Sequence, residues 1–269
     1  VEALLKANNA PTRPTFVIWP GRSSHGEFSE YSIVPTQYSP FGFTADATPG
    51  SLEAVRHRRA GVQDEGSQLV AYLFAQAAHQ SHSWLDLCAG PGGKAALLSA
   101  LAQQSNHPFT ANELSQVRAD LVAQVVGDSQ VWVGDARKIA ERNQRFDAIL
   151  ADVPCTGIGA LRRRPEVRWR RSVQDLRALV QLQQEISDAA ISILNVGGVF
   201  GYATCSPHLA ETSIAVADIL KKHPELIQID VSEFLPQGMQ GAIRDKSLAL
   251  WTHRHNTDGM FLALFRKSA

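Results

Sequence analysis

An acid and a thiol stand three residues apart in the segment 146–157, which reads FDAILADVPCTG. Its apolar residues predict a short buried strand that ends at Asp152, just before the turn that carries Cys155. The carboxyl ends of parallel strands are where an open α/β sheet binds its ligands. A thiolate beside an acid or base can act as a nucleophile. The same residues also fit an ordinary strand-ending turn with a buried cysteine, so the rest of the chain has to decide.

A second thiol, Cys205, follows the strand predicted at 198–204, in the sequence YATCSP. Neighbouring strands of a doubly wound sheet end at the same edge, so we expect Cys155, Cys205 and Asp152 to face one pocket. Such a group suits methylation of carbon 5 of cytosine, because a thiolate that adds to carbon 6 activates carbon 5, and a base then removes the carbon 5 proton. The residues alone do not determine which cysteine attacks, and both could instead be structural.

A glycine-rich turn follows the strand predicted at 83–87, within the sequence WLDLCAGPGGK. Gly90, Gly92 and Ala95 match the loose dinucleotide pattern G-x-G-x-x-G/A. Glu113 ends the next strand, at the distance where an acid meets a ribose. The turn is not a P-loop, because alanine follows its lysine. It suits a nicotinamide or flavin dinucleotide, or S-adenosylmethionine.

Acidic residues close three successive predicted strands, at Glu113, Asp135 and Asp152. Together they would line one acidic crevice. The sulfonium and amino groups of S-adenosylmethionine are cationic and suit such a crevice, whereas the pyrophosphate of a dinucleotide would be repelled. The sequence therefore favours S-adenosylmethionine as the cofactor, with a nicotinamide-dependent oxidoreductase as the alternative enzyme.

Strand and helix patterns alternate over residues 83–223, which predicts an α/β fold with a parallel, doubly wound sheet. Strands are predicted at 83–87, 109–112, 130–133, 146–151 and 198–204, with an antiparallel pair at 226–231 and 260–265. Helices are predicted at 68–78 with Ser67 as N-cap, at 91–101 with Pro91 in the first turn, at 115–126 with Ser115 as cap, at 173–194 and at 209–222. Residues 1–60 show a mixed pattern and predict a small α+β subdomain ahead of a catalytic domain at 61–269.

The chain of 269 residues carries 26 basic and 26 acidic side chains, so any basic surface for nucleic acid has to be local. No apolar run reaches the length of a membrane span. Three widely spaced cysteines argue against a disulfide framework and a zinc site, so we expect a reduced, cytoplasmic setting and no bound metal. The chain begins at Val1 inside a predicted helix, which suggests a fragment of a longer protein.

Six arginines and one tryptophan fall within residues 161–171, shortly after the Pro-Cys turn. Such a run suits an RNA backbone with a stacked base, and the target base would have to be extruded from a helix to reach the thiols. We expect RNA contacts from Arg162, Arg163, Arg164, Arg168, Trp169 and Arg170, and from Arg58 and Arg59. The alternatives are a solvated segment that Trp169 packs down and, for the whole chain, a non-catalytic RNA-binding subunit.

Five segments carry a resemblance to a known family: VQDEGSQL, LDLCAGPGGK, FDAILADVPCTGIGALRRRPEVRW, YATCSP and TDGMFLALF, with GDAR between them. On these segments the chain resembles the bacterial RNA 5-methylcytosine methyltransferases, the family named after ribosomal RNA small subunit methyltransferase B. The resemblance implies a Rossmann-like methyltransferase fold, S-adenosylmethionine as cofactor, and RNA, expected to be ribosomal, as substrate. It also implies that the N-terminal subdomain contacts RNA, and that an RNA-binding helical domain precedes it in close relatives.

The resemblance further implies roles for individual residues. Cys205 would be the nucleophile and Cys155 the base that helps to release the product, with Asp152 and Lys94 completing the catalytic group. The cofactor would be bound by Cys88, Ala89, Gly90, Pro91, Gly92, Gly93, Lys94, Glu113, Asp135 and Asp152. The chain departs from the family after Cys205, where Leu209-Ala210-Glu211-Thr212 stands in place of Pro-Glu-Glu-Asn, so the role of the second acid of that motif stays open.

Overall fold

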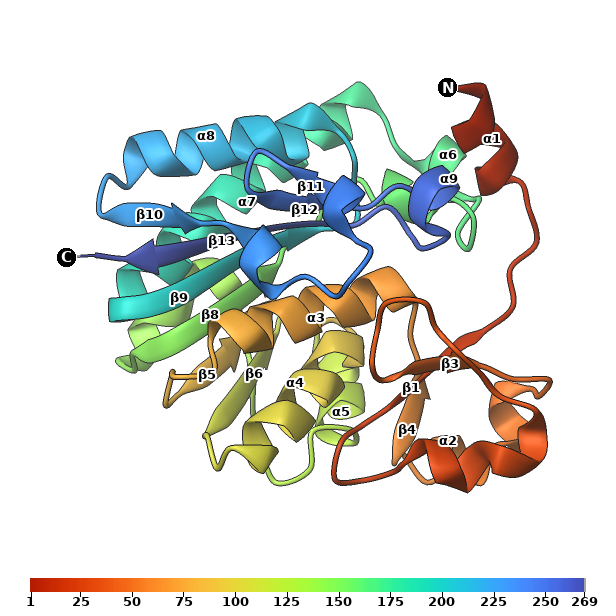
Figure 1. Ribbon diagram of the computed structural model, residues 1–269. Helices are drawn as coiled ribbons and strands as arrows, with labels where there is room; N and C mark the ends of the chain where they lie inside the picture. Colours follow the sequence, from red (N-terminus) through yellow and green to blue (C-terminus); the bar gives the residue numbers. More distant parts are fainter. Residues whose placement is uncertain (269) are drawn as a thin grey trace.

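Five parallel strands form one side of a nine-stranded sheet in the computed structural model, which describes residues 1–268 (Figure 1). They are β5 (Trp84–Asp86), β6 (Phe109–Glu113), β7 (Gln130–Val133), β8 (Phe146–Asp152) and β9 (Leu194–Thr204). Their order is β7-β6-β5-β8-β9, so the strand order reverses between β5 and β8. Doubly wound sheets bind their ligands at such a switch point. The predicted parallel sheet is confirmed.

An antiparallel extension completes the sheet beyond β9. β13 (Phe261–Lys267) runs antiparallel to β9 and pairs with β12 (Ser247–Ala249) near its start and with β10 (Leu226–Ile229) near its end. β11 (Ile243–Arg244) forms the edge next to β12. The predicted antiparallel pair of late strands is therefore confirmed. Within residues 1–268, no helix combines the length and the apolar character needed to span a membrane.

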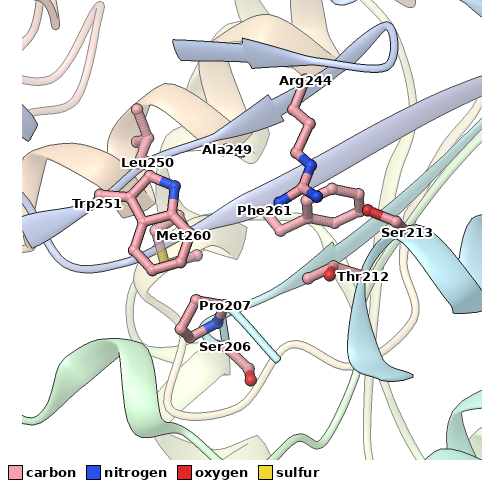
Figure 2. A pocket seen from close by; sticks show the side chains of 10 residues that line it. All are labelled: Ser206, Pro207, Thr212, Ser213, Arg244, Ala249, Leu250, Trp251, Met260 and Phe261. Carbon is pink, nitrogen blue, oxygen red and sulfur yellow. The ribbon is translucent and has the colours of Figure 1, made fainter. Parts of the chain in front are cut away.

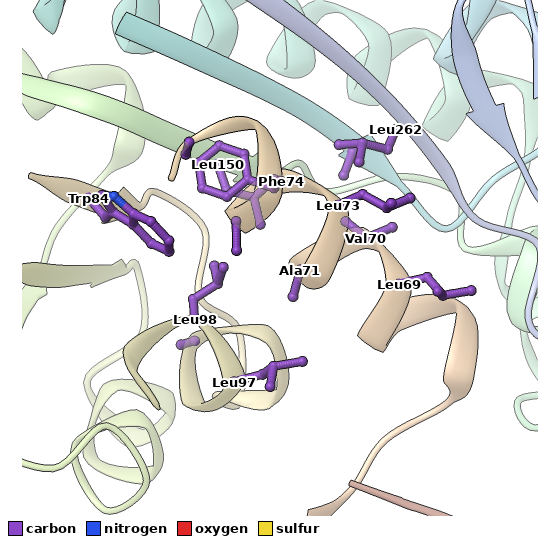
Figure 3. Packing of buried hydrophobic residues seen from close by; sticks show 14 of the residues in the cluster. Leu69, Val70, Ala71, Leu73, Phe74, Trp84, Leu97, Leu98, Leu150 and Leu262 are labelled. Atoms are coloured by element: carbon purple, nitrogen blue, oxygen red, sulfur yellow. The ribbon is translucent and has the colours of Figure 1, made fainter. Parts of the chain in front are cut away.

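Helices cover both faces of this sheet (Figure 1). One face carries α3 (Glu65–Ala77), α4 (Gly93–Gln104) and α5 (Gln116–Ala123), and Figure 3 shows Phe74 and Leu98 among the side chains that pack with Trp84 and Leu150 of the sheet. The other face carries the 3-10 helix η3 (Ala136–Arg142), α7 (Val173–Ile193) and α8 (Ser213–Lys222), which form a second buried cluster. Apolar burial of this kind contributes roughly 25 cal/mol per Å². The two cores hold the carboxyl ends of the strands as one rigid edge.

Several helices begin at residues other than those the sequence predicted. α3 starts before Ser67, because Asp64 acts as its N-cap and accepts a hydrogen bond from Gly66 N at 2.8 Å. α4 leaves Pro91 outside its first turn, because Gly92 adopts a left-handed φ of 104°. The helix predicted at 209–222 is split into a 3-10 turn, η5 (Leu209–Glu211), and α8, because the residue between them leaves the helical region. α5 does begin after its predicted cap.

The N-terminal part of the chain forms a second, antiparallel sheet with its own core. Its four strands are β2 (Val34–Pro35), β3 (Gly42–Thr44), β1 (Thr15–Ile18) and β4 (Ala60–Val62), in that order. The other elements of this part are α1 (Glu2–Asn8), α2 (Glu53–Arg56) and the 3-10 helices η1 (His25–Tyr31) and η2 (Pro49–Ser51). Phe16, Phe28 and Phe43 are buried at its centre. The division proposed between residues 60 and 61 falls in β4.

Buried polar contacts join the two sheets. Glu65, at the start of α3, accepts hydrogen bonds from the backbone of Tyr38 and from Ser39 N, the latter at 2.9 Å. Gln68 donates to the carbonyl of Phe16 at 3.2 Å. Arg22 donates to Ser99 Oγ of α4 at 3.0 Å. Because groups buried in this way are costly to separate, these contacts hold the small sheet in one position against the large one.

Candidate active site

The two thiols at the ends of β8 and β9 lie in contact. β8 and β9 pair in parallel with Asp152 opposite Ala203, so the turns that follow them start side by side. Cys155 Sγ is 3.4 Å from Cys205 Sγ. The structure thus brings together the acid and the two thiols that the sequence predicted for one pocket.

A buried lysine stands beside the thiol pair. Lys94, from the first turn of α4, donates a hydrogen bond from Nζ to Asp152 Oδ2 at 2.8 Å. Burial works against the charged form of Lys94, but the carboxylate of Asp152 outweighs it and raises the pKa of Lys94 above its ordinary value. The site therefore holds a fixed positive charge next to the sulfur atoms.

The two thiols differ in acidity. The hydrogen bond from Cys155 lowers the pKa of Cys205; burial and the charge of Asp152 oppose this shift, and the charge of Lys94 favours it. The same sulfur–sulfur hydrogen bond, followed by burial, raises the pKa of Cys155 well above its ordinary value. The pair therefore favours a thiolate on Cys205 and a proton on Cys155.

Glu211 holds the two cysteine turns together, although the sequence left its role open. Its side chain is fully buried, and Oε1 accepts hydrogen bonds from Thr156 N at 2.8 Å and from Gln183 Nε2 at 3.0 Å. Its other oxygen, Oε2, accepts a hydrogen bond from the hydroxyl group of Thr156. The oxygen of that hydroxyl group, Oγ1, is also 3.1 Å from Ser206 Oγ. Thr156 and Ser206 directly follow the two cysteines. The network of Glu211, Gln183, Thr156 and Ser206, called here the turn network, therefore sets the positions of both thiols.

A contact between two glycines packs a third segment against the Cys205 turn. Gly159, in the 3-10 turn η4 (Ile158–Ala160), donates from its N–H to the carbonyl of Cys205 at 3.0 Å, and its own carbonyl accepts from Gly259 N at 2.8 Å. A Cβ atom at Gly159 would lie 2.0 Å from the carbonyl oxygen of Gly259. Only glycine allows this approach.

Three distant sequence motifs meet beside this contact. Arg163 forms an ion pair with Asp258, a residue that is only 1% exposed. Asp64 Oδ2 accepts a hydrogen bond from Asp258 N at 3.0 Å. Burial, and then the charge of Asp258, raise the pKa of Asp64 to about 6. The arginine run, the start of α3 and the segment before β13 are thereby locked together.

A cleft of about 530 Å³ opens at the switch point and reaches the two thiols. That volume lies in the range of small-ligand sites. Of the residues predicted to bind a cofactor, those that line the cleft are Cys88, Gly90, Glu113, Asp135 and Asp152. Ala89, Pro91, Gly92, Gly93 and Lys94 belong to the same turn and helix start but are not among the lining residues. A Cβ at Gly92 would meet Val125 of the α5 end at 2.7 Å, so this glycine serves packing.

Two arginines that the sequence did not single out hold acids of the cleft. Arg118 forms an ion pair with Glu113, and Arg137 forms a bidentate pair with Asp135, with Nη2 to Oδ2 at 2.7 Å. Both arginines also line the cleft. The short spacing from Asp135 to Arg137 is the signal that could have revealed this pair, because it fits an Asx turn closed by the Arg137 N–H.

The arginine run divides into anchored and displayed side chains. Arg162 donates to Asn256 Oδ1 at 2.7 Å, and Arg171, which was not predicted as a contact, donates to the carbonyl of Thr156 at 3.2 Å. Trp169 is 79% exposed, so it does not pack the segment down, and that part of the alternative is wrong. Arg58 and Arg59 follow α2, which lies at the lower edge of Figure 1, far from α6 (Val167–Arg170) at the upper right. The predicted contact residues therefore do not form one surface.

The family described as 16S rRNA methyltransferase RsmB/F matches residues 73–266 of the chain. The chain belongs to this family. It is 44% identical over 274 residues to a Mycobacterium tuberculosis protein named as a methyltransferase, over 99% of this chain and 59% of that protein. It is 33% identical over 286 residues to ribosomal RNA small subunit methyltransferase B of Yersinia pestis, over 97% of this chain and 61% of the relative. The chain thus spans about three fifths of the length of these family members.

Solved structures share the family fold. NSun6 from Pyrococcus horikoshii, crystallised with SFG, superposes with a TM-score of 0.81 at 18% identity, over 100% of this chain and 94% of that chain. A methyltransferase homologue from the same organism superposes with a TM-score of 0.77 at 19% identity, over 98% and 90%. At these identities the likeness concerns the fold, and the predicted Rossmann-like methyltransferase fold is confirmed.

S-adenosylmethionine is the cofactor of this family, and the residues of the cleft fit it. Asp86, next to the lining residues Leu87 and Cys88, is 1% exposed, and neither carboxylate oxygen has a hydrogen-bond partner within residues 1–268. Burial raises the pKa of Asp86 to about 7; Asp152 adds to the shift and Lys94 opposes it. A carboxyl group that is buried beside the cleft without a hydrogen-bond partner suits a cationic ligand.

Proposed function

We propose that this chain transfers a methyl group from S-adenosylmethionine to carbon 5 of a cytosine in RNA, expected to be ribosomal, through a covalent cysteine adduct. One observation carries the proposal: two thiols of unlike acidity lie 3.4 Å apart at the end of the cofactor cleft. A reaction that needs an attacking thiolate and a separate base would use such a pair. The relatives named as ribosomal RNA small subunit methyltransferase B support RNA as the class of substrate.

In the first half of the proposed reaction, Cys205 is the nucleophile. Its thiolate bonds to carbon 6, and the electrons of the carbon 5–carbon 6 double bond become available at carbon 5. S-adenosylmethionine, when bound, would supply an electrophilic methyl group to carbon 5, with S-adenosylhomocysteine as the leaving group. The ammonium group of Lys94, held by Asp152, stabilises the thiolate before attack and the negative charge of the ring after it.

In the second half, Cys155 is the base. While Cys205 is a thiolate, its hydrogen bond with Cys155 and burial keep the proton on Cys155. Once Cys205 is a thioether, its thiolate no longer raises the pKa of Cys155, and Cys155 has to lose its proton to solvent before it can act as the base. Cys155 then removes the carbon 5 proton. The double bond re-forms, the carbon 6–sulfur bond breaks, and Cys205 leaves as the thiolate.

Two single variants test this division of roles. Cys205→Ala should give no adduct and no methylation, because the bond to carbon 6 cannot form. Cys155→Ala should still attack and accumulate a covalent RNA adduct, visible as a shifted band on a denaturing gel, because release is blocked. An adduct that persists in Cys205→Ala and disappears in Cys155→Ala would reverse the roles.

A non-catalytic RNA-binding subunit is the rival reading, and a simple assay separates it from the enzyme. The wild-type chain, incubated with RNA and S-adenosylmethionine labelled in the methyl group, should transfer label to cytosine. RNA binding without any transfer would favour the rival. We also propose residues 1–60 as the linking, RNA-contacting subdomain and residues 61–269 as the catalytic domain.

A further inference from the structure

Three short helices from distant parts of the sequence form one corner of the molecule. α1, α6 and α9 (Thr252–His255) lie together at the upper right of Figure 1. α1 packs against α9. Arg168 of α6 donates to Oδ1 of Asn9, the residue after α1, at 2.8 Å. Arg162 donates to Oδ1 of Asn256, the residue after α9, at 2.7 Å. These contacts hold the three helices in fixed relation.

The outward side of this corner is basic and carries an exposed indole. We call it the basic corner, and its exposed side chains are Lys6, Arg168, Trp169, Arg170, His253 and Arg254. The segments 1–9, 164–171 and 251–256 hold six lysine or arginine residues against two glutamates, in a chain whose formal net charge is zero. Trp169 is 79% exposed, so most of its indole ring stands open to a partner among these cations.

The basic corner begins at the mouth of the cleft that holds the thiols. Arg164, Val167 and Arg171 line the cleft, and Val167 is the first residue of α6. On the other side of the Cys205 turn, Figure 2 shows Trp251 close to Pro207, and Trp251 is the N-cap residue of α9. An RNA strand that leaves the cleft would therefore meet α6 on one side and α9 on the other.

Two anchored arginines, Arg162 and Arg163, support this surface and do not belong to it. Arg163 is committed to the buried carboxylate of Asp258, and Arg162 to Asn256. Arg170 has no hydrogen bond or ion pair with any other residue of 1–268 that would restrain its guanidinium. The same run of arginines thus supplies both the scaffold and the displayed charges.

We propose that the basic corner binds the single-stranded RNA that flanks the target nucleotide, with Trp169 stacking on a base and Arg170 and Arg254 contacting phosphates. Cationic side chains around an exposed aromatic ring are how proteins hold single-stranded nucleic acid, because every base offers a flat face and every linkage a charge. This inference rests on the proposed function, since it says where the same RNA is held. It replaces Arg58 and Arg59, beyond α2, as the second contact region.

Binding of a fluorescein-labelled single-stranded RNA, measured by anisotropy over a series of salt concentrations, tests the proposal. Trp169→Ala should weaken binding about tenfold, and Trp169→Phe should restore most of the loss because it keeps an aromatic face. Arg170→Ala and Arg254→Ala should each weaken binding several-fold and reduce the slope of log K against log salt by about 0.7. The matched control is Arg266→Ala, which should bind like wild type; Arg266 is exposed near the end of β13, a strand that ends on the side of Figure 1 opposite to α6.

Thermal unfolding and methyl transfer make the outcomes separable. The three displayed side chains are exposed, so their variants should unfold at the wild-type temperature, and reduced binding then reports contact and not misfolding. Wild-type affinity in Trp169→Ala and Arg254→Ala, or a larger loss in Arg58→Ala than in Arg170→Ala, would overturn the basic corner. If these variants bind normally while wild type still methylates RNA, only this inference fails; RNA binding at the corner without methylation would instead refute the proposed function.

Discussion

The turn network predicts that Glu211 positions the thiols without touching the substrate. Glu211→Ala removes the acceptor of three hydrogen bonds and leaves Thr156 N and Gln183 Nε2 without it. Gln183 Nε2 keeps its hydrogen bond to the carbonyl of Pro154, so Thr156 N is the donor left unsatisfied. A buried, unsatisfied donor costs about 1–3 kcal/mol, so the free energy of unfolding should fall by about 2 kcal/mol. Glu211→Gln keeps one carbonyl oxygen for the two N–H donors, and its amide N–H can donate to Thr156 Oγ1. The free energy of unfolding of Glu211→Gln should therefore fall by only about 1 kcal/mol.

The consequence for catalysis follows from the geometry of the two turns. Thr156 Oγ1 lies 3.1 Å from Ser206 Oγ, and these two residues directly follow Cys155 and Cys205. If the two turns lose Glu211 and move apart, the thiols separate with them. A displacement of about 1 Å at reacting groups costs about 100-fold in rate. The single-turnover methylation rate should fall by this factor in Glu211→Ala and by less than about tenfold in Glu211→Gln.

Three measurements separate positioning from mere stability. Urea unfolding gives the free-energy loss, and single-turnover methylation at saturating S-adenosylmethionine gives the rate. The rate at which diamide oxidises Cys155 and Cys205 to a disulfide reports their spacing, and it should drop in Glu211→Ala and recover in Glu211→Gln. A Glu211→Ala chain that is less stable but keeps the wild-type oxidation rate and methylation rate would refute the reasoning.

Three further predictions concern residues around the site. Arg163→Ala should lower the free energy of unfolding by about 2 kcal/mol, because it leaves buried Asp258 unpaired while the guanidinium itself is partly exposed. The control Arg170→Ala should change the free energy of unfolding by less than about 0.5 kcal/mol. Equal losses for the two variants in urea unfolding would contradict the anchor role of Arg163. Gly159→Ala should lower methylation by at least about 100-fold, because its Cβ would lie 2.8 Å from the Cys205 carbonyl oxygen, whereas Gly241→Ala, where no atom lies within 4 Å, should be neutral. Asp86 has its pKa raised from 3.8 to about 7, so the folded chain binds this proton more tightly than the unfolded chain, and stability of the cofactor-free chain should fall as pH rises from 4 to 7, by about 4 kcal/mol. Asp86→Asn should flatten that dependence in urea unfolding, and parallel curves for the two chains would count against it.

Local sequence pattern was enough to predict the sheet and the meeting of the thiols. The apolar segments that became β8 and β9 are separated by a long helix, and such units pair in parallel with their carboxyl ends at one edge. Once both strands were recognised, Asp152, Cys155 and Cys205 had to lie close together. The acids at the ends of β6 and β8 reached the cleft by the same rule.

Helix starts and polar partners did not follow from local pattern. Ser67 is as good an N-cap as Asp64 on propensity alone, yet Asp64 is chosen because it also accepts a hydrogen bond from Asp258, 194 residues away in sequence. Glu211 finds Thr156 across 55 residues, and Arg163 finds Asp258 across 95. No periodicity or spacing signals such partners.

The sequence by itself determined the fold class, the cofactor cleft and the presence of two thiols and an acid at one edge of the sheet. Only the tertiary structure decided which thiol is the more acidic, which acid holds the two turns, and which arginines are anchored and which are displayed. The physical reason is that apolar patterning acts along each element, whereas every buried polar group has to find a partner in three dimensions, wherever in the chain that partner lies.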